Sequence, residues 1–196
     1  MGFAGYRRLG STGVVSDCFV DPEFQAQGIG TRMLRFLLPA GDQVMTLASA
    51  DPKAHSLYRR MGMLPVADCP YTSTTVAGGT VAVREVDRYP VPAADLEHLV
   101  VDLGARRVEV ETSAAAVTAS SIETSVIGPG DEAPEVIAAL LGFVGGRVEI
   151  QMSEQHLAFE SFQWEEAARD TLMASSGAEV PDHTRITFNG DLFGVG

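Results

Sequence analysis

The stretch of sequence that decides the fold reads Val20-Asp21-Pro22-Glu23-Phe24-Gln25-Ala26-Gln27-Gly28-Ile29-Gly30-Thr31-Arg32-Met33-Leu34. It continues a run of β-branched and aromatic residues that predicts a strand over 14–20. Its end has apolar residues at helical spacing, which predicts a helix over 31–38 that stops at Pro39 and Gly41. Two glycines therefore stand in a turn between a strand and a helix.

This turn is typical of an anion site. Glycine lets the backbone approach a ligand closely, and the first amides of a helix are free donors in a positive field. A phosphate or pyrophosphate fits such a site. A glycine-rich turn without a ligand would have the same sequence pattern. It is not a Walker loop, because no lysine follows Gly30, and it lacks the third glycine of a Rossmann loop.

The rest of the front half alternates short strands and helices, which predicts an α/β arrangement with a mixed sheet. A helix is expected over 51–61, because Asp51 can cap it and Pro52 suits its first position. The strands that we expect here cover residues 2–9, 44–48, 63–67 and 80–86.

Charge divides the chain in two. The formal net charge is −12. Residues 1–89 hold 9 basic and 8 acidic residues, net +1, whereas residues 90–196 hold 5 and 18, net −13. The closely spaced prolines after Tyr89 coincide with this break. We therefore expect one domain over 1–89 and an appended acidic α+β domain over 90–196.

Within the second domain, strands are expected over 107–111, 122–127, 147–152 and 185–188. Helices are expected over 133–143 and 163–174.

Composition excludes several classes of partner. An isoelectric point near 4.6 predicts no binding to nucleic acid or to an anionic membrane. No apolar run reaches the ~18 residues that span a bilayer, and two cysteines are too few for a disulfide scaffold. We therefore expect a cytoplasmic protein. No metal site is expected, because His98, His156 and His183 lack ligand spacing.

Two motifs carry a family resemblance. Val20, Pro22, Gln25, Gly28 and Gly30 match V-x-P-x-x-[QR]-x-x-G-x-[GA], which resembles motif A of the GNAT N-acetyltransferase superfamily. A second motif of that family, N-x-x-A-x-x-L-Y-x-x-x-G-F, is matched downstream by Asp51, Ala54, Leu57, Tyr58, Gly62 and Met63. Asp51 replaces Asn and Met63 replaces Phe. The resemblance covers residues 2–88, and the back half resembles no family that we recognise.

The resemblance implies a partial GNAT-like acyltransferase fold and acetyl-CoA as co-substrate, lying where the fourth and fifth family strands part. The backbone of Cys18, Phe19 and Val20 would pair with the pantetheine arm. Asp51 and Ala54 would line the thioester end. Amides over the turn would hold the pyrophosphate, namely those of Gln25, Ala26, Gln27, Gly28, Ile29, Gly30 and Thr31.

The resemblance also implies the chemistry. Tyr58 would be the general acid that protonates the departing thiolate, and a phenol on a helix can supply that proton; the other reading is a half-buried aromatic on an amphipathic helix. Asp17 is the first candidate for the general base and His55 the alternative, and each can instead be a solvated surface group. Cys18 is not expected to be a nucleophile, because the family transfers the acetyl group directly.

The expected function is acetyl transfer to a primary amine of a small molecule or protein. The alternative is a non-catalytic CoA-binding or interaction module. The chain begins at the family's third strand, which leaves three readings open. In the first the gene starts upstream, in the second the chain is an inactive relic, and in the third the back half or a partner subunit covers the open sheet edge. A homodimer is a candidate assembly. The acidic back half is also a candidate surface for a cationic acceptor.

Overall fold

The computed structural model describes residues 1–9, 11–79, 83–88, 104–158 and 162–188. The chain forms two compact units, and each takes segments from both halves of the sequence. Unit 1 contains Met1–Asp68 and Asp170–Val180, and unit 2 contains Cys69–Arg169 and the segment that starts at Pro181. These bounds differ from the division expected at residue 89. The proline junction after Tyr89, like His98, lies outside the described residues.

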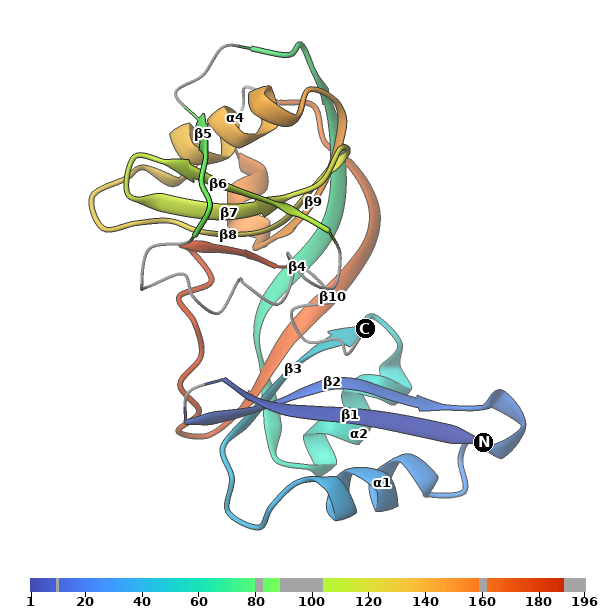
Figure 1. The fold of residues 1–196 in the computed structure, drawn as a ribbon. Coiled ribbons are helices and arrows are strands. Elements are labelled where there is room, and N and C mark those ends of the chain that lie inside the picture. Colours follow the sequence, from blue (N-terminus) through green and yellow to red (C-terminus); the bar gives the residue numbers. More distant parts are fainter. Residues whose placement is uncertain (10, 80–82, 89–103, 159–161, 189–196) are drawn as a thin grey trace. The chain divides into compact units, whose positions relative to one another are not determined.

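Unit 1 is built on a mixed sheet with the order β1-β2-β3-β10 (Figure 1). The antiparallel pair β1 (Gly2–Leu9) and β2 (Thr12–Val20) forms a hairpin, and β3 (Val44–Ser49) runs parallel to β2. The last strand, β10 (Glu165–Ser175), pairs antiparallel with β3. The strands expected over 2–9, 14–20 and 44–48 are confirmed.

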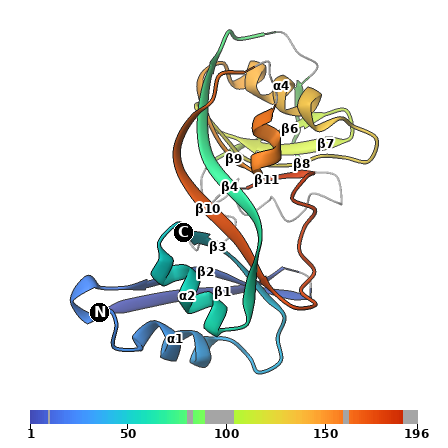
Figure 2. The same cartoon turned by 180° about the vertical axis from the view of Figure 1, so that it is seen from behind.

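Two helices cover one face of this sheet (Figure 2). They are α1 (Ile29–Leu37) and α2 (Pro52–Arg60), and a short 3-10 turn, η1 (Pro22–Phe24), precedes α1. Leu34 of α1 and Tyr58 of α2 pack into one buried cluster with Val15, Val44 and Ala48 of the strands, as well as Met63 and Met173. The burial of this cluster fixes both helices on the sheet.

The helix expected over 163–174 is wrong, because this segment is the strand β10. Its alanines, glutamates and leucine favour a helix locally. Pairing overrides that preference: Asp170 to Ala174 pair with Ser49 to Met45 of β3, and Thr171, Leu172, Met173 and Ala174 are all buried. Side chains buried on both faces of a strand hide the alternation that would have identified it.

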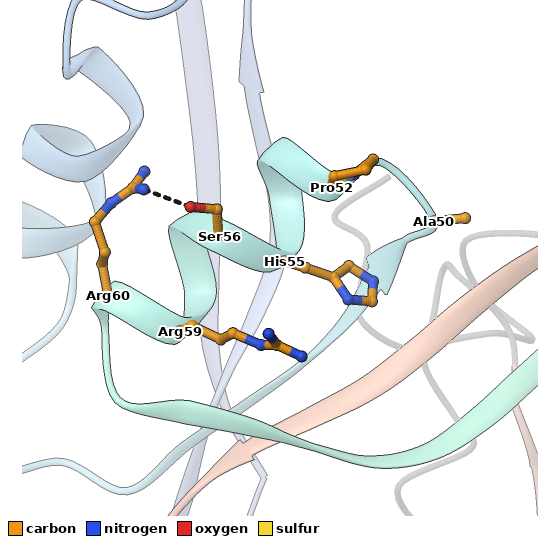
Figure 3. Close-up of a pocket in the computed structure, with 6 residues that line it drawn as sticks. All are labelled: Ala50, Pro52, His55, Ser56, Arg59 and Arg60. Carbon is orange, nitrogen blue, oxygen red and sulfur yellow. Dashed lines mark hydrogen bonds between the residues drawn. The ribbon is translucent and has the colours of Figure 1, made fainter.

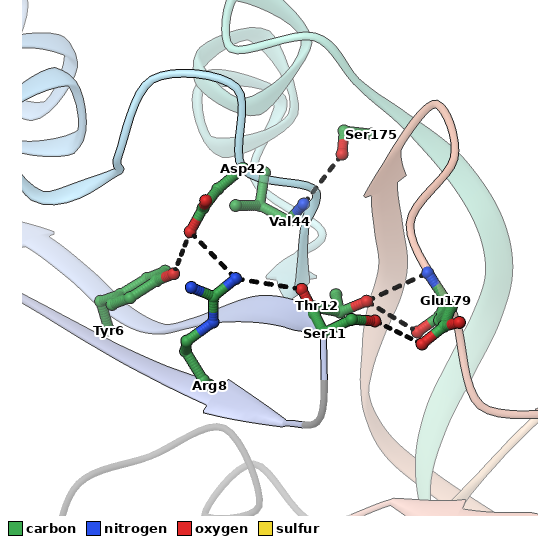
Figure 4. A network of polar contacts seen from close by, with 8 residues as sticks. All are labelled: Tyr6, Arg8, Ser11, Thr12, Asp42, Val44, Ser175 and Glu179. Atoms are coloured by element: carbon green, nitrogen blue, oxygen red, sulfur yellow. Dashed lines mark hydrogen bonds and ion pairs between the residues drawn. The ribbon is translucent and has the colours of Figure 1, made fainter.

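The segment after β10 is anchored to unit 1 by polar contacts (Figure 4). The Ser175 hydroxyl accepts a hydrogen bond of 2.8 Å from the Val44 amide. Glu179 is held twice by Thr12, whose hydroxyl donates to its carbonyl at 3.2 Å and accepts from its amide at 3.0 Å. These contacts join residues from opposite ends of the sequence.

Unit 2 contains a sheet with the order β4-β9-β11-β8-β7-β6-β5. The strands are β4 (Met63–Val76), β5 (Val83–Glu85), β6 (Arg106–Val110), β7 (Ser113–Val117), β8 (Ser121–Val126), β9 (Gly146–Met152) and β11 (Ile186–Phe188). Helix α4 (Ala133–Val144) packs Ile137 and Leu140 onto this sheet, and a 3-10 turn, η3 (Glu154–Ala158), follows β9.

Most expected elements of the back half are confirmed, including the helix that became α4. The sequence missed β7, because its alanine run has low strand propensity. β7 is a strand because it pairs with both β6 and β8 and is buried throughout. No helix among the described residues combines the length and the apolar character that crossing a bilayer requires.

Candidate active site

The site is built around a fork between β2 and β3. These strands pair only at Gly13↔Val44, Val14↔Met45 and Val15↔Thr46. Beyond this point β2 stays paired with β1 up to Val20, and β3 stays paired with β10 up to Ser49. The parallel ladder therefore ends where a substrate arm was expected to lie between the strands.

A β-bulge lies directly after the last rung of the fork. The pairs Ala4↔Cys18 and Tyr6↔Val15 leave Gly5 of β1 opposite two residues of β2, Ser16 and Asp17. A bulge bends its strand and re-aims the backbone groups that it carries. This bulge was not predicted from the sequence. Its signal was Gly5, since a lone glycine inside a strand often marks a bulge.

The loop after β2 is held by the side chain of Gln25. Its Nε2 donates to the Val20 carbonyl oxygen at 2.9 Å, and its Oε1 accepts from Lys53 Nζ at 3.3 Å. The loop is thereby tied to the end of β2 and to the first turn of α2. Lys53 is a contributor that the sequence analysis missed.

The N-terminus of α1 is open to a ligand. Gly28 is the N-cap in a left-handed conformation, with φ of 74°, and no side chain caps the helix there. Ala26 also has a positive φ of 60°, which is uncommon for a residue with a Cβ. The first turn holds Ile29, Gly30 and Thr31, and Gln27 before it is exposed. Its amides are therefore free of the side-chain acceptor that usually occupies them.

Gly30 leaves little room for a side chain, because α1 lies close to its neighbours. A Cβ at this position would come within 3.2 Å of Leu57 Cδ2, 3.7 Å of Val20 Cγ2 and 3.8 Å of Cys18 Sγ. A Cβ alone requires only a small shift of the Leu57 side chain, whereas a bulky side chain would collide with β2 and α2. The second glycine of the motif therefore keeps the helix N-terminus next to the fork.

The N-terminus of α2 is capped by its own residue. The Asp51 carboxylate accepts a hydrogen bond of 2.8 Å from the Lys53 amide, so one of its oxygens serves the helix. Ala54 is half-buried against the unit 1 core. Asp51 thus caps the helix that carries Ala54 and Tyr58, as the motif spacing predicts.

Tyr58 is the buried group at the fork, with 6% of its surface exposed. Its pKa is raised to about 12, first because the phenol is buried and then because Cys18, once ionised at high pH, and Asp17 repel a tyrosinate. A hydrogen bond with Thr46 acts in the opposite direction. The phenol therefore keeps its proton at neutral pH, as a proton donor must.

Three of the predicted site residues, Asp17, Cys18 and Phe19, lie near the end of β2 and have different surroundings. Asp17 lies near enough to the Tyr58 phenol and the Cys18 thiol to raise the pKa of both. Burial is the larger cause of the raised pKa of Cys18, and a thiol kept protonated is a poor nucleophile. The Phe19 side chain is half exposed and packs on Phe3, with ring centroids 5.7 Å apart.

The second candidate for the base, His55, lies on α2 three residues before Tyr58. Its Nε2 is buried and has no hydrogen-bond partner within the described part of the chain. His156 is buried in unit 2 and His183 belongs to the same unit. Across the described ranges, no group of three histidine, cysteine or acidic residues could hold a metal ion.

Unit 2 contains a similar strand–helix–strand arrangement whose fork is occupied. β8 and β9 run parallel only at Ser121↔Glu149 and Ile122↔Ile150, with α4 between them in the sequence. Further along, β11 pairs with both strands, with β8 at Val126 and Ser125 and with β9 at Met152 and Gln151. The backbone groups that a ligand could use there are therefore engaged by a strand.

Comparisons with known proteins agree with this arrangement. Residues 1–63 match the family model described as the acetyltransferase (GNAT) family. No curated protein gives a significant match to the chain.

Solved structures give the wider likeness. A protein assigned as an acetyltransferase from Pyrococcus horikoshii superposes with a TM-score of 0.76 at 17% identity, over 96% of this chain and 74% of that chain. A GCN5-related N-acetyltransferase from Sphaerobacter thermophilus superposes with a TM-score of 0.52 at 15% sequence identity, over 89% of this chain and 76% of that chain. A tandem GNAT protein from the clavulanic acid biosynthesis pathway superposes with a TM-score of 0.55 at 13% sequence identity, over 89% of this chain and 78% of that chain.

At these identities the likeness concerns the fold. It extends over both units, including the back half that the sequence analysis left without a family. The glycine motif of the front half lies inside the matched segment. The fork between β2 and β3, the loop after β2 and Tyr58 also lie within residues 1–63. Residues 1–63 therefore match the GNAT acetyltransferase family in sequence, and the likeness in fold extends beyond them.

Proposed function

We propose that unit 1 is an acyl-CoA-dependent N-acetyltransferase that moves an acetyl group from acetyl-CoA to a primary amine of a small molecule or protein. The family performs acyl transfer, and the proposal specifies the donor and the acceptor. The observation that carries it is the fork between β2 and β3, with the buried, protonated phenol of Tyr58 beside it.

The residues of the front half fit acetyl-CoA. The amides from Gln25 to Thr31 surround a helix N-terminus without a side-chain cap, which suits a pyrophosphate. The backbone of Cys18, Phe19 and Val20 continues β2 past the end of its ladder with β3 and would pair with the pantetheine arm. Asp51 and Ala54 would line the thioester end. When bound, acetyl-CoA supplies the activated acyl group as a thioester.

The chain's own groups would move the protons. Asp17 would accept a proton from the acceptor ammonium, directly or through water, which frees the amine lone pair. The bulge at Ser16 and Asp17 would aim a backbone amide at the carbonyl oxygen as negative charge develops there. Tyr58 would donate its phenol proton to the departing sulfur. His55 is the alternative base.

A non-catalytic CoA-binding or interaction module on the same scaffold is the second candidate. The observation that favours it is the position of β1, which is the edge strand of the unit 1 sheet over the described residues. An exposed edge can pair with another chain. The proposal has three further parts. The chain forms a homodimer, its acidic residues attract a cationic acceptor, and it is located in the cytoplasm.

Two measurements separate these functions. Calorimetry with acetyl-CoA tests binding, and release of free thiol across a panel of amines tests turnover. Binding with turnover supports the acetyltransferase, and binding without turnover on any amine supports the non-catalytic module. A folded sample that binds no acetyl-CoA would contradict both.

A further inference from the structure

The outer face of α2 carries a pocket to which the proposed chemistry assigns no ligand (Figure 3). It is a cavity of about 520 Å³, lined by Ala50, Pro52, His55, Ser56, Arg59 and Arg60. The helical members recur three and four residues apart and therefore share one helix face. Leu57, by contrast, packs into the core.

The ionisable side chains that line this pocket are an imidazole and two guanidinium groups. In the chain as described, neither Arg59 nor Arg60 lies within ion-pair distance of a carboxylate. Elsewhere arginines pair with glutamates: Arg84 with Glu109, Arg106 with Glu85, Arg147 with Glu165 and Arg169 with Glu166. In a chain of net charge −12, this pocket therefore concentrates positive charge without compensation.

One polar atom of the pocket residues needs a partner. His55 Nε2 is buried, and no group within the described residues bonds to it. A buried polar nitrogen without a partner costs free energy, and such atoms are uncommon. The basic residues near the end of α2 also suit the helix dipole, but the dipole does not account for the unpartnered imidazole nitrogen.

Arg60 is already positioned by its neighbour. Its Nη1 donates to Ser56 Oγ at 2.7 Å, a contact one helical turn back. Figure 3 shows the Arg59 side chain on the same side of the helix as His55. An oxygen-bearing anion between these two residues would accept hydrogen bonds from both, and charge-assisted bonds of this kind are strong.

We propose that the pocket formed by His55, Ser56, Arg59 and Arg60 binds an oxyanion group, a phosphate or a carboxylate carried by one of the two reactants. The two sources are the 3′-phosphate of acetyl-CoA and an anionic group on the amine acceptor. Assignment to a reactant rests on the proposed acetyltransferase function, whereas binding of the anion itself does not. A purely cationic acceptor would be repelled from this pocket.

The first test measures anion binding without activity. Inorganic phosphate is titrated into the full chain labelled with ¹³C-histidine, and the signal lost in His55→Gln identifies His55 among the four histidines. We expect a saturable shift of the His55 signal, weakened about tenfold or more in Arg59→Ala, because a charge-assisted bond is lost. Arg35→Ala, which removes an exposed arginine from α1, is the matched control and should not change the titration.

A His55 signal that does not respond to phosphate, or an Arg59→Ala titration equal to that of Arg35→Ala, would overturn the proposal. This result is independent of turnover, so an inactive but phosphate-binding protein would contradict the proposed function alone.

The second test assigns the source. Arg59→Ala should raise KM for acetyl-CoA but not for 3′-dephospho-acetyl-CoA if the cofactor phosphate occupies the pocket. It should raise KM for an amine that carries a carboxylate, but not for its amide analogue, if the acceptor does. If neither KM changes in an active enzyme, the assignment of the pocket to a reactant is wrong.

Discussion

The Thr46 hydroxyl donates a hydrogen bond of 2.9 Å to the Val15 carbonyl oxygen, across the last rung that β2 and β3 share. Thr46 also lies close enough to the Tyr58 phenol to lower its pKa. One buried side chain thus ends the ladder and influences the proposed proton donor.

Tyr58→Phe removes this donor without changing the shape of the helix face. We expect turnover to fall by about 10²- to 10⁴-fold, because general acid catalysis contributes that much. Affinity for CoA should change little, since the amides that would hold the pyrophosphate lie elsewhere. Rate assays and calorimetry check the two effects, with Tyr71→Phe in β4 as the control substitution. An unaltered rate would remove Tyr58 from the mechanism.

The pH dependence of Tyr58 follows from its burial. Because its pKa is raised to about 12, the phenol should not ionise near pH 10 as a free tyrosine does. Ionisation disfavours the folded state, so this contribution to stability is complete below pH 10 and is lost as pH rises towards 12. Thr46→Val should raise the pKa further, because the hydrogen bond that lowers it is removed.

Ultraviolet titration of tyrosinate tests this. The step near pH 12 should be absent in Tyr58→Phe. A Tyr58 that titrates near pH 10 would show that the phenol is not buried.

The base can be identified by two substitutions. If Asp17 accepts the proton, Asp17→Asn should lower turnover by about 10²-fold or more at neutral pH. His55→Gln should then leave turnover close to that of the unmodified chain. The opposite pattern would make His55 the base, and turnover unchanged in both variants would exclude both residues.

The glycine at the start of α1 is a test of the loop. Gly28→Val forces a β-branched residue into a left-handed conformation, with φ of 74°. We expect loss of acetyl-CoA binding. Gly41 is the matched control: its φ is 88°, and a Cβ there would also meet nothing within 4 Å. Gly41→Val should therefore destabilise the chain but bind acetyl-CoA normally once folded. Equal loss of binding in both variants would contradict a specific role for Gly28.

The front half should not fold without the back half. A fragment of residues 1–89 lacks β10, so the β3 edge would be open and the unit 1 core would lose Met173. We expect poorly dispersed amide signals and no cooperative thermal unfolding from this fragment, whereas the full chain gives both. A fragment that unfolds cooperatively would show that unit 1 is complete without β10.

Sequence reasoning found the elements whose signals are local. The strand, loop and helix around Gly28 and Gly30, and the helix begun by Asp51 and Pro52, follow from residue types at short spacing. It missed what depends on distant partners. The local sequence of β10 favours a helix, and its pairing with β3 makes it a strand. The local sequence of β7 favours no element, and its pairing with β6 and β8 makes it a strand.

The candidate site shows the same division between local and distant signals. The motif named the loop and Tyr58, because the family resemblance spans both. The bulge at Ser16 and Asp17 was not visible, since it is a mismatch between two strands and belongs to neither alone. Thr46 was missed for a similar reason: only the fold brings it to Tyr58.

The exchange of strands between the two halves has a consequence for synthesis on the ribosome. The bond between Val44 and Ser175 spans 131 residues, and that between Thr12 and Glu179 spans 167. The sheet of unit 1 cannot be completed until almost the whole chain has been translated, because β10 is made late. The edge of β3 therefore stays unpaired until then. Such delayed, long-range pairing slows folding and leaves nascent chains prone to aggregation. We therefore expect the nascent chain to bind chaperones until its last strands have left the ribosome.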